Sequence, residues 1–251
     1  MRMTRNSAAR HLVLGIGGLL CLLIFWWAGI HLFGNADGLS GRFSPQATFA
    51  SLWELLGRAE LYEHALISLK RIFVGLSLAL LIGVPLGLLI GSSRNLEAAT
   101  TPAFQLLRMI SPLSWMPVVV MLMGVGDQPI YFLLTFAAVW PILLNTVAGV
   151  RQLDPRWLQL SRSLSATRWE TLSKVIVPGI VGHVLTGARL SIGILWIVLV
   201  PCEMLGVSAG LGYFILDTRD RLAYSELMAM VVVIGLLGFA LDASARNLHR
   251  R

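Results

Sequence analysis

Charged side chains are scarce in this chain of 251 residues. Only 13% of the residues are charged, whereas soluble domains carry about 25%, and 56% are hydrophobic. The mean hydropathy is correspondingly high, at +0.76. This composition excludes an ordinary soluble domain and predicts a protein that lies in a lipid bilayer.

Lysine is almost absent, which excludes one common way of binding nucleotide. A phosphate-binding loop needs Gly-Lys followed by Ser or Thr, but Lys70 and Lys174 follow Leu69 and Ser173. The chain also lacks the Gly-x-Ser-x-Gly turn of serine hydrolases, and its histidines have no metal-ligand spacing. We therefore expect no catalytic residue, cofactor or metal on this chain, and any ATP-Mg to be used by another subunit.

Cysteine is equally rare. Cys21 and Cys202 both lie in apolar runs without the spacing of a disulfide framework or a zinc site. The net charge of +7 does not indicate nucleic-acid binding, because the basic excess of a membrane protein collects at its cytoplasmic edges. We expect the lipid bilayer, and no nucleic acid, as a partner.

What the chain does have is long apolar runs. A bilayer core about 30 Å thick needs about 20 apolar residues per helix, and six runs are candidates, the last of them somewhat short. They are Leu12–Phe33, Ile72–Gly91, Pro102–Gly124, Ile130–Val150, Val184–Pro201 and Leu227–Leu241. The predicted fold is all-α, a polytopic membrane protein with six transmembrane helices.

The N-terminal part differs from the rest. The first span lacks a small-x-small cleavage site, so it is predicted to be a signal anchor. Phe49, Leu52, Trp53, Leu55 and Leu56 follow at helical spacing, which predicts an amphipathic helix at the outer interface that binds there or, more simply, packs against the helix bundle. We divide the chain into 1–65, with this anchor and outer segment, and 66–251, the transmembrane core.

The distribution of basic residues predicts the topology. Twelve Lys and Arg residues fall on the assigned cytoplasmic segments, including the short turn 92–101. Six fall outside: Arg42, Arg58, Lys70, Arg71, Arg219 and Arg221. This bias places both termini in the cytoplasm. We expect a multi-pass protein of the bacterial inner membrane.

The polar stretch Arg151–Pro178, called the hairpin below, interrupts the apolar C-terminal half. Asp154 before Pro155 is typical of a helix start. Thr167 and Glu170 have the spacing of a capping box, which predicts a second helix. The stretch therefore predicts two short helices between membrane spans.

The second helix of the hairpin has two further predicted features. Glu170 and Lys174 are placed for an ion pair one turn apart. Val177 precedes Pro178, which disfavours helical geometry, so the helix is expected to end about there.

The segments Leu164–Pro178 and Leu185–Gly193 resemble the EAA loop of binding-protein-dependent ABC importer permeases with the MetI-like fold. The resemblance is greatest to the nitrate, sulfonate and taurine branch, and it runs from about Ser68 almost to the end of the chain. It also includes 83–91, 124–127, 141–151, 154–155, 203–206 and 210–213.

The resemblance implies a permease that forms a dimer, most simply with a second copy of itself. A periplasmic binding protein would deliver a nitrate-, sulfonate- or taurine-like oxyanion. The hairpin would be the coupling helix that docks on a dimer of ABC ATPase subunits. The residues implied in this coupling are Arg162, Ser165, Thr167, Arg168, Trp169, Glu170 and Pro178.

The hairpin departs from the family motif at two places. Gln159, Leu160 and Ser161 stand where the motif has Glu-Ala-Ala, and Ser165 stands where it has glycine. Glycine reverses a chain at no steric cost, whereas serine is strained at positive φ. The alternative interpretation of the hairpin is a solvated basic loop that only obeys the positive-inside bias. Trp169 favours docking, since a tryptophan on a polar hairpin fills a partner's pocket or rests on the membrane.

Four polar residues in the spans are candidates for a pathway or gate. Ser111, Ser114 and Asn145 lie in proline-interrupted spans, where they either line a passage or bond between helices. Glu203 lies where the fifth span meets the outside. Since a carboxylate repels an anion, Glu203 is expected to gate or pair helices, or simply to be solvated.

A different function class is also compatible with a polytopic membrane protein. The chain would then be a non-transport scaffold, or an accessory subunit of a membrane-bound enzyme complex. Such a protein would not need its hairpin to bind an ATPase, so ATPase capture discriminates between the two.

Overall fold

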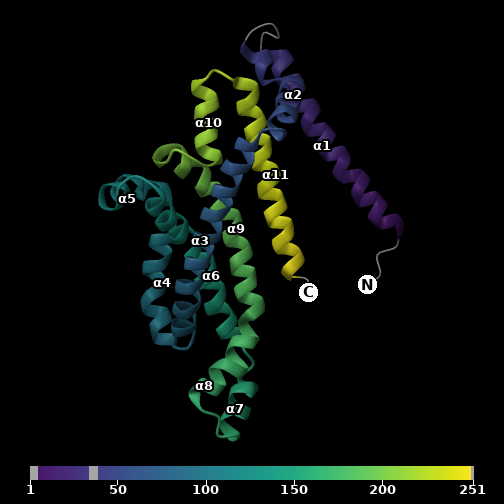
Figure 1. Ribbon diagram of the computed structural model, residues 1–251. Helices are drawn as coiled ribbons and strands as arrows, with labels where there is room; N and C mark the ends of the chain where they lie inside the picture. Colours follow the sequence, from purple (N-terminus) through teal and green to yellow (C-terminus); the bar gives the residue numbers. More distant parts are fainter. Residues whose placement is uncertain (1–4, 34–38, 250–251) are drawn as a thin grey trace. The chain divides into compact units, whose positions relative to one another are not determined.

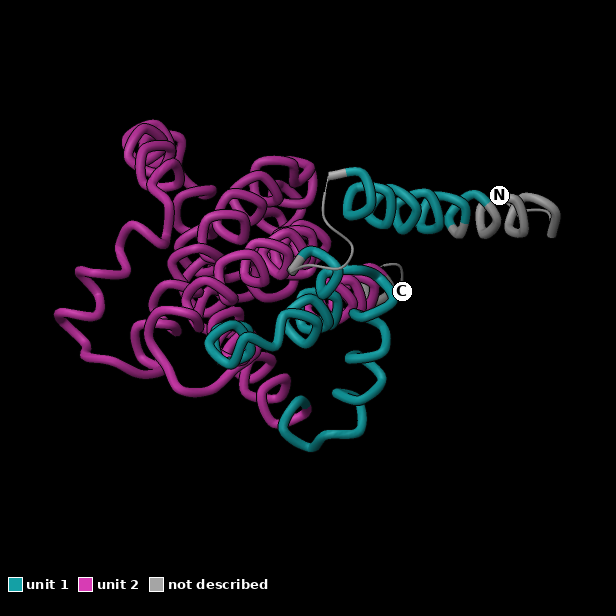
Figure 2. Tube along the Cα trace, turned by 90° about the horizontal axis from the view of Figure 1, so that it is seen from above, with its two compact units in different colours: residues 1–61, 215–233 teal, residues 62–214, 234–251 magenta. Residues whose placement is uncertain are grey.

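The computed structural model describes residues 5–33 and 39–249, and among these it contains helices and turns but no strand. The chain forms two compact units (Figure 2). One unit holds 1–61 and 215–233, and the other holds 62–214 and 234–251. Arg2, Arg250 and Arg251, which enter the predicted charge bias, lie outside the described residues.

The first unit contains the N-terminal helices. Helix α1 spans Arg5–Phe33, a 3-10 turn spans Leu39–Phe43, and α2 spans Pro45–Leu56. Helix α2 confirms the predicted helix, with Leu55 buried and Trp53 exposed. The described apolar part of α1 is Gly17–Leu32, so its crossing of the membrane stays a prediction.

Four helices of the described chain are long and apolar enough to span a bilayer. They are Ala59–Gly91 (α3), Asp127–Gln152 (α6), the continuous helix Arg168–Gly206, and Tyr224–Arg246 within α11. Helix α11 itself spans Tyr224–His249, and α10 before it spans Leu211–Asp220. The helices α3, α6 and α11 are confirmed at the predicted spans, each longer than expected.

The predicted third span is not one straight helix. Helix α4 spans Arg94–Met109, a 3-10 turn spans Pro112–Trp115, and α5 spans Met116–Met123. The two halves are bent by 82°. The bend occurs because Ser111 precedes Pro112 and takes extended geometry, with φ −59° and ψ 129°.

The predicted short turn at 92–101 is also wrong, since most of it is helical. Helix α4 begins inside it, at Arg94, with the Ser93 hydroxyl accepting from the Leu96 N–H at 3.4 Å. With the bent pair counted as one span, the described residues offer five spans. The predicted number of six is not established.

The predicted end of the hairpin's second helix is also wrong. A π-helical turn over Leu172–Ile176 leads directly into α9, Val177–Gly206. Val177 is helical, with φ −56° and ψ −51°. Pro178 lies in the first turn of α9, where its missing N–H costs least, and the widened turn before it breaks the usual hydrogen-bond ladder.

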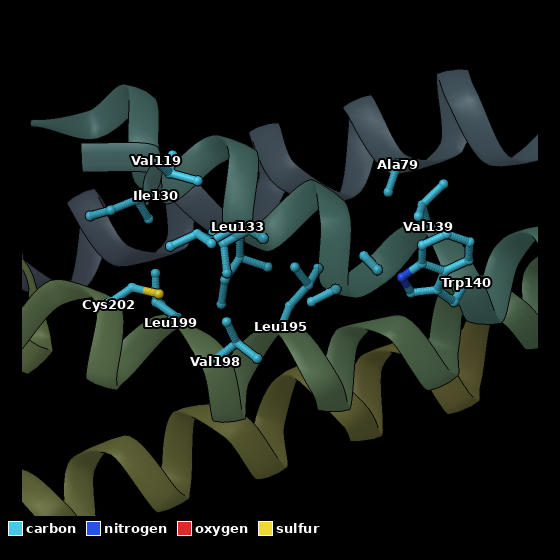
Figure 3. Packing of buried hydrophobic residues seen from close by; sticks show 14 of the residues in the cluster. Ala79, Val119, Ile130, Leu133, Val139, Trp140, Leu195, Val198, Leu199 and Cys202 are labelled. Carbon is cyan, nitrogen blue, oxygen red and sulfur yellow. The ribbon is translucent and has the colours of Figure 1, made fainter. Parts of the chain in front are cut away.

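The core of the second unit lies between α6 and α9 (Figure 3). Leu133 and Trp140 of α6 pack with Leu195, Leu199 and other apolar residues in one cluster. Helix α3 approaches α6 through a glycine stripe: a Cβ added to Gly87 would lie 2.6 Å from the Thr146 Cβ. As expected, these small residues bring the helices together.

Candidate functional site

The hairpin begins with a capped helix. Helix α7 spans Pro155–Ser163, and the Asp154 Oδ1 accepts from the Arg156 N–H at 2.9 Å. The predicted start at Asp154-Pro155 is confirmed. The cap satisfies one of the N–H groups that a helix leaves unpaired at its start.

The chain then reverses at Ser165. The Ala166 N–H donates to the Ser161 carbonyl, and the Ser165 N–H donates to the Arg162 carbonyl, both at 3.0 Å. These two bonds form the Schellman motif that normally ends on glycine. Ser165 adopts φ +54°, so the serine makes the expected turn and bears its conformational cost.

Helix α8, Arg168–Thr171, is held by the predicted capping box. The Glu170 carboxylate accepts from the Thr167 N–H at 2.8 Å, and the Thr167 hydroxyl accepts from the Glu170 N–H at 3.2 Å. The hydroxyls of Ser161 and Thr171 lie 2.7 Å apart and join α7 to α8. The predicted ion pair of Glu170 with Lys174 is not among the ion pairs of the described chain, and Thr167 instead bonds to one oxygen of the carboxylate.

The outer surface of the hairpin carries exposed aromatic and basic side chains. Trp169 is 73% exposed, and Trp157 and Leu164 are also largely uncovered. Arg162 and Arg168 are exposed beside them. Because the hairpin leaves the large apolar side chain of Trp169 uncovered on a polar segment, this surface has the character of a contact site.

A hollow of about 1800 Å³ lies next to the hairpin. The ends of α3 and α6, helix α4, and α7 and α8 line it. Its charged lining residues are Arg94, Glu97, Arg151, Arg162 and Arg168. The single carboxylate is paired, since Glu97 lies 2.6 Å from the Arg151 guanidinium. The hollow is therefore strongly basic.

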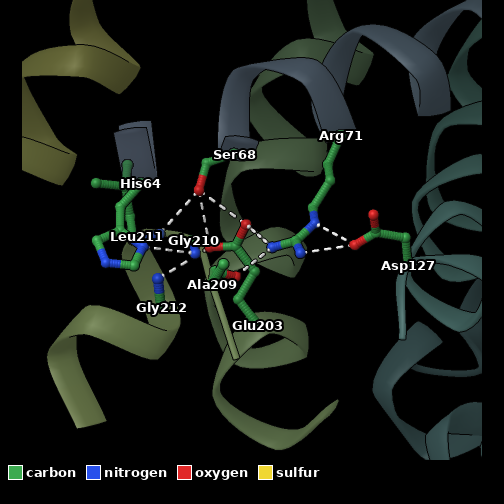
Figure 4. A network of polar contacts seen from close by, with 9 residues as sticks. All are labelled: His64, Ser68, Arg71, Asp127, Glu203, Ala209, Gly210, Leu211 and Gly212. Atoms are coloured by element: carbon green, nitrogen blue, oxygen red, sulfur yellow. Dashed lines mark hydrogen bonds and ion pairs between the residues drawn. The ribbon is translucent and has the colours of Figure 1, made fainter. Parts of the chain in front are cut away.

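At the other end of α9, Glu203 is completely buried in a network of polar contacts (Figure 4). Its Oε1 accepts from the Arg71 guanidinium at 2.7 Å and from the Ser68 hydroxyl at 2.8 Å. Its Oε2 accepts from the Gly212 N–H at 2.9 Å. A buried carboxylate needs such partners, and here α3 and the first turn of α10 supply them.

Arg71 is the centre of this buried network, which comprises His64, Ser68, Arg71, Asp127, Glu203 and 209–212. Its guanidinium also donates to Asp127 Oδ1 at 2.6 and 3.0 Å and to the Ala209 carbonyl at 2.7 Å. Arg71 is 3% exposed. The sequence placed Arg71 on the outer side, but its ion pair with Glu203 was not predicted. The signal available was a cation and a carboxylate at the outer ends of two predicted spans.

The other residues expected in a pathway do not gather with Glu203. Ser111 and Ser114 are exposed at the bend between α4 and α5. The Asn145 side chain donates to the Pro141 carbonyl of its own helix, at 2.8 Å. Among the described residues, no cluster of His, Cys, Asp or Glu is suited to a metal ion.

Fold and sequence together identify the class of protein. The family described as "Binding-protein-dependent transport system inner membrane component" matches residues 83–251. This chain belongs to that family and is a permease of the ABC importer type. The alternative of a non-transport scaffold is not favoured.

Individual relatives make the placement more specific. The chain is 32% identical to the bicarbonate transport system permease protein CmpB of Synechococcus elongatus, over 95% of this chain and 88% of the relative. It is 31% identical to the taurine transport system permease protein TauC of Escherichia coli, over 98% and 91%. It is 35% identical to the nitrate import permease protein NrtB of Synechocystis, over 70% and 64%.

Solved structures show the same fold. The MetNI methionine ABC transporter in an inward-facing conformation matches with a TM-score of 0.62 at 19% identity. The match covers 79% of this chain and 95% of that chain. The expected MetI-like fold is confirmed.

Proposed function

We propose that this permease carries a small oxyanion or sulfonate inward across the bacterial inner membrane. Relatives are named for bicarbonate, taurine and nitrate transport, and these solutes share a compact anionic group. The basic hollow beside the hairpin supports the same class, because a cleft lined by one sign of charge concentrates ions of the opposite sign.

The hairpin is the part that docks on a separate ATPase subunit. The observation that carries this proposal is the 73% exposure of Trp169 on a helix fixed by a capping box. A rigid, uncovered tryptophan flanked by arginine is the kind of residue that dominates binding energy at protein interfaces. Arg162, Arg168 and Trp169 would contact the ATPase, while Ser165, Thr167 and Glu170 would hold the hairpin's shape.

The remaining partners follow from the family. A second copy of the permease would complete the membrane part, and a dimer of ATPase subunits would bind the two hairpins. A periplasmic binding protein would deliver the solute at the opposite face. Both termini would then lie in the cytoplasm, and residues 66–251 would form the transporting core.

Glu203 would not contact the solute in this scheme. Both of its oxygens are engaged by Arg71, Ser68 and Gly212, and its charge repels an anion. Its proposed role is to pair α9 with α3 at the outer end and to hold the following loop, as a gate residue or a helix lock.

Co-purification with the ATPase tests the proposal. The wild-type permease, solubilised in detergent, should capture the ATPase subunit, and the Trp169→Ala, Arg168→Glu double variant should lose capture. Trp53→Ala is the matched control, because Trp53 is 81% exposed on α2, outside the hairpin. Equal capture by the double variant would contradict the coupling role.

A further inference from the structure

Helix α4 carries a narrow polar stripe. Arg94, Glu97, Thr101, Gln105 and Arg108 recur at intervals of three or four residues, so they share one face of the helix. Ala103 and Leu106 point to the opposite side by the same spacing. A helix with this pattern faces water or a polar partner on one side only.

The C-terminal part of the stripe lies level with the middle of α6. Phe104 packs on Trp140, with ring centroids 5.7 Å apart, and Trp140 is near the centre of α6. Leu107 packs against the buried core cluster. Figure 1 shows α4 running alongside α6. The residues from Thr101 to Arg108 therefore lie well inside the apolar layer that α6 crosses.

Arg108 has nothing to neutralise it there. It is exposed, and within the described part of the chain no carboxylate pairs with it. An arginine at this depth is costly when it faces lipid, and such residues normally face the interior of the helix bundle or a water-filled cavity. The same helix face lines the 1800 Å³ hollow further along, through Arg94, Glu97 and Thr101.

The backbone just beyond Arg108 is irregular. Ile110 and Ser111 are extended, and the 82° bend follows. The hydroxyl-bearing residues Ser111 and Ser114 are exposed at this bend. Broken helices at membrane depth occur where they border a cavity or protein. The exposed Arg108 side chain and these two hydroxyls thus lie on neighbouring stretches of chain at an irregular piece of backbone.

We propose that the α4 stripe is a wall of the solute passage and that Arg108 binds the passing anion. The ligand class is a small oxyanion such as bicarbonate, nitrate or a sulfonate, which a planar guanidinium holds through paired hydrogen bonds. The inference rests on the proposed transport of an anion and deepens it. It assigns the contact to α4 and not to Asn145, which the sequence offered as a residue that lines a passage or bonds between helices.

Thiol accessibility tests the passage without any need for transport. In a Cys21→Ser, Cys202→Ala background, Gln105→Cys should react in open membrane fragments with charged methanethiosulfonate reagents at least about tenfold faster than Leu106→Cys on the opposite face. The anionic reagent should outpace the cationic one by roughly tenfold, and Arg108→Gln should abolish that preference. Equal reaction at both positions, or a preference that survives Arg108→Gln, would overturn the proposal.

Uptake tests the ligand. Permease co-expressed with its ATPase would be assayed with bicarbonate, nitrate and taurine in turn. Arg108→Gln should lower uptake of the carried solute at least about tenfold, Arg108→Lys should retain part of it, and Arg246→Gln, on α11, should leave it unchanged.

ATPase capture distinguishes failure of the proposed function from failure of the anion site on α4. All these variants should capture the ATPase like the wild type, because none alters the hairpin. Failure of the wild type to capture the ATPase or to take up an anion would refute the proposed function. Normal uptake by Arg108→Gln, in a system where the wild type transports, would refute the anion site alone.

Discussion

The two ends of α9 are built on opposite principles. At its C-terminal end, Glu203 is fully buried and Arg71 is 3% exposed, and each makes several hydrogen bonds. At its N-terminal end, the hairpin leaves Trp169 73% exposed. The C-terminal end satisfies its polar groups within the chain. The N-terminal end leaves side chains exposed, where a partner protein can contact them.

The two ends should therefore respond differently to mutation, one in the stability of the permease and the other in binding to a partner. A buried charge that loses its partner remains in a medium of low polarity, so the cost appears in the stability of the permease. An exposed side chain on a well-capped hairpin contributes little to folding, so its loss should appear in binding.

The largest expected effect is on the buried network. Arg71→Met should destabilise the permease by about 3–5 kcal/mol, because it leaves the Glu203 carboxylate buried without a cation. The measurement is thermal unfolding of the purified protein in detergent. Arg219→Met is the control: the Arg219–Asp220 pair, at 2.9 Å, is largely exposed, and its loss should cost about 1 kcal/mol or less. Equal losses in the two variants would contradict the contrast.

A smaller loss is expected from the loop that closes the network. Gly210 has φ +117°, and an added Cβ would collide with the carboxylate of Glu203 and the guanidinium of Arg71. Gly210→Ala should cost about 1–3 kcal/mol from backbone strain, and more from the collision. Gly126→Ala isolates the strain, because Gly126 has φ +136° and open space around it. If both variants melt at the same temperature, the network is not tightly packed.

At the hairpin, Thr167→Ala should cost about 1 kcal/mol of local stability, through loss of the capping box. Hydrogen exchange of the amides of 168–171 should speed up accordingly, with no change in the melting temperature. Ser173→Ala is the control, since its hydroxyl bonds only to the Trp169 carbonyl. A large drop in melting temperature with Thr167→Ala would mean that the hairpin is part of the folded core.

The smallest expected effect is a gain. Ser165→Gly should stabilise the hairpin by about 0.5–1 kcal/mol, because glycine occupies φ +54° without steric strain. Slower exchange of the Ala166 amide, which donates in this turn, would measure it. Ser163→Gly, at the last residue of α7, should have the opposite sign. A loss of stability with Ser165→Gly would show that the serine side chain has a role in the turn.

The hairpin was the most predictable part of the molecule. Its helix start at Asp154 and its capping box at Thr167 depend on residues within one turn of each other, so the local sequence contains the information. The same local logic failed at Val177, because the preference of a residue before proline is weak and a π-helical turn carried the helix past it. It failed again in the third span, where prolines indicated an interruption but not its angle.

The sequence alone determined that the chain is a helical membrane protein, where most spans lie, how the hairpin is capped and which family it resembles. These features follow from apolar length, helical period and short motifs. The tertiary structure decided the rest: Arg71 meets Glu203 although 132 positions separate them, and Phe104 of α4 packs on Trp140 at the middle of α6. Such contacts depend on how whole helices pack, because the cost of a buried or membrane-depth charge is set by its neighbours in space.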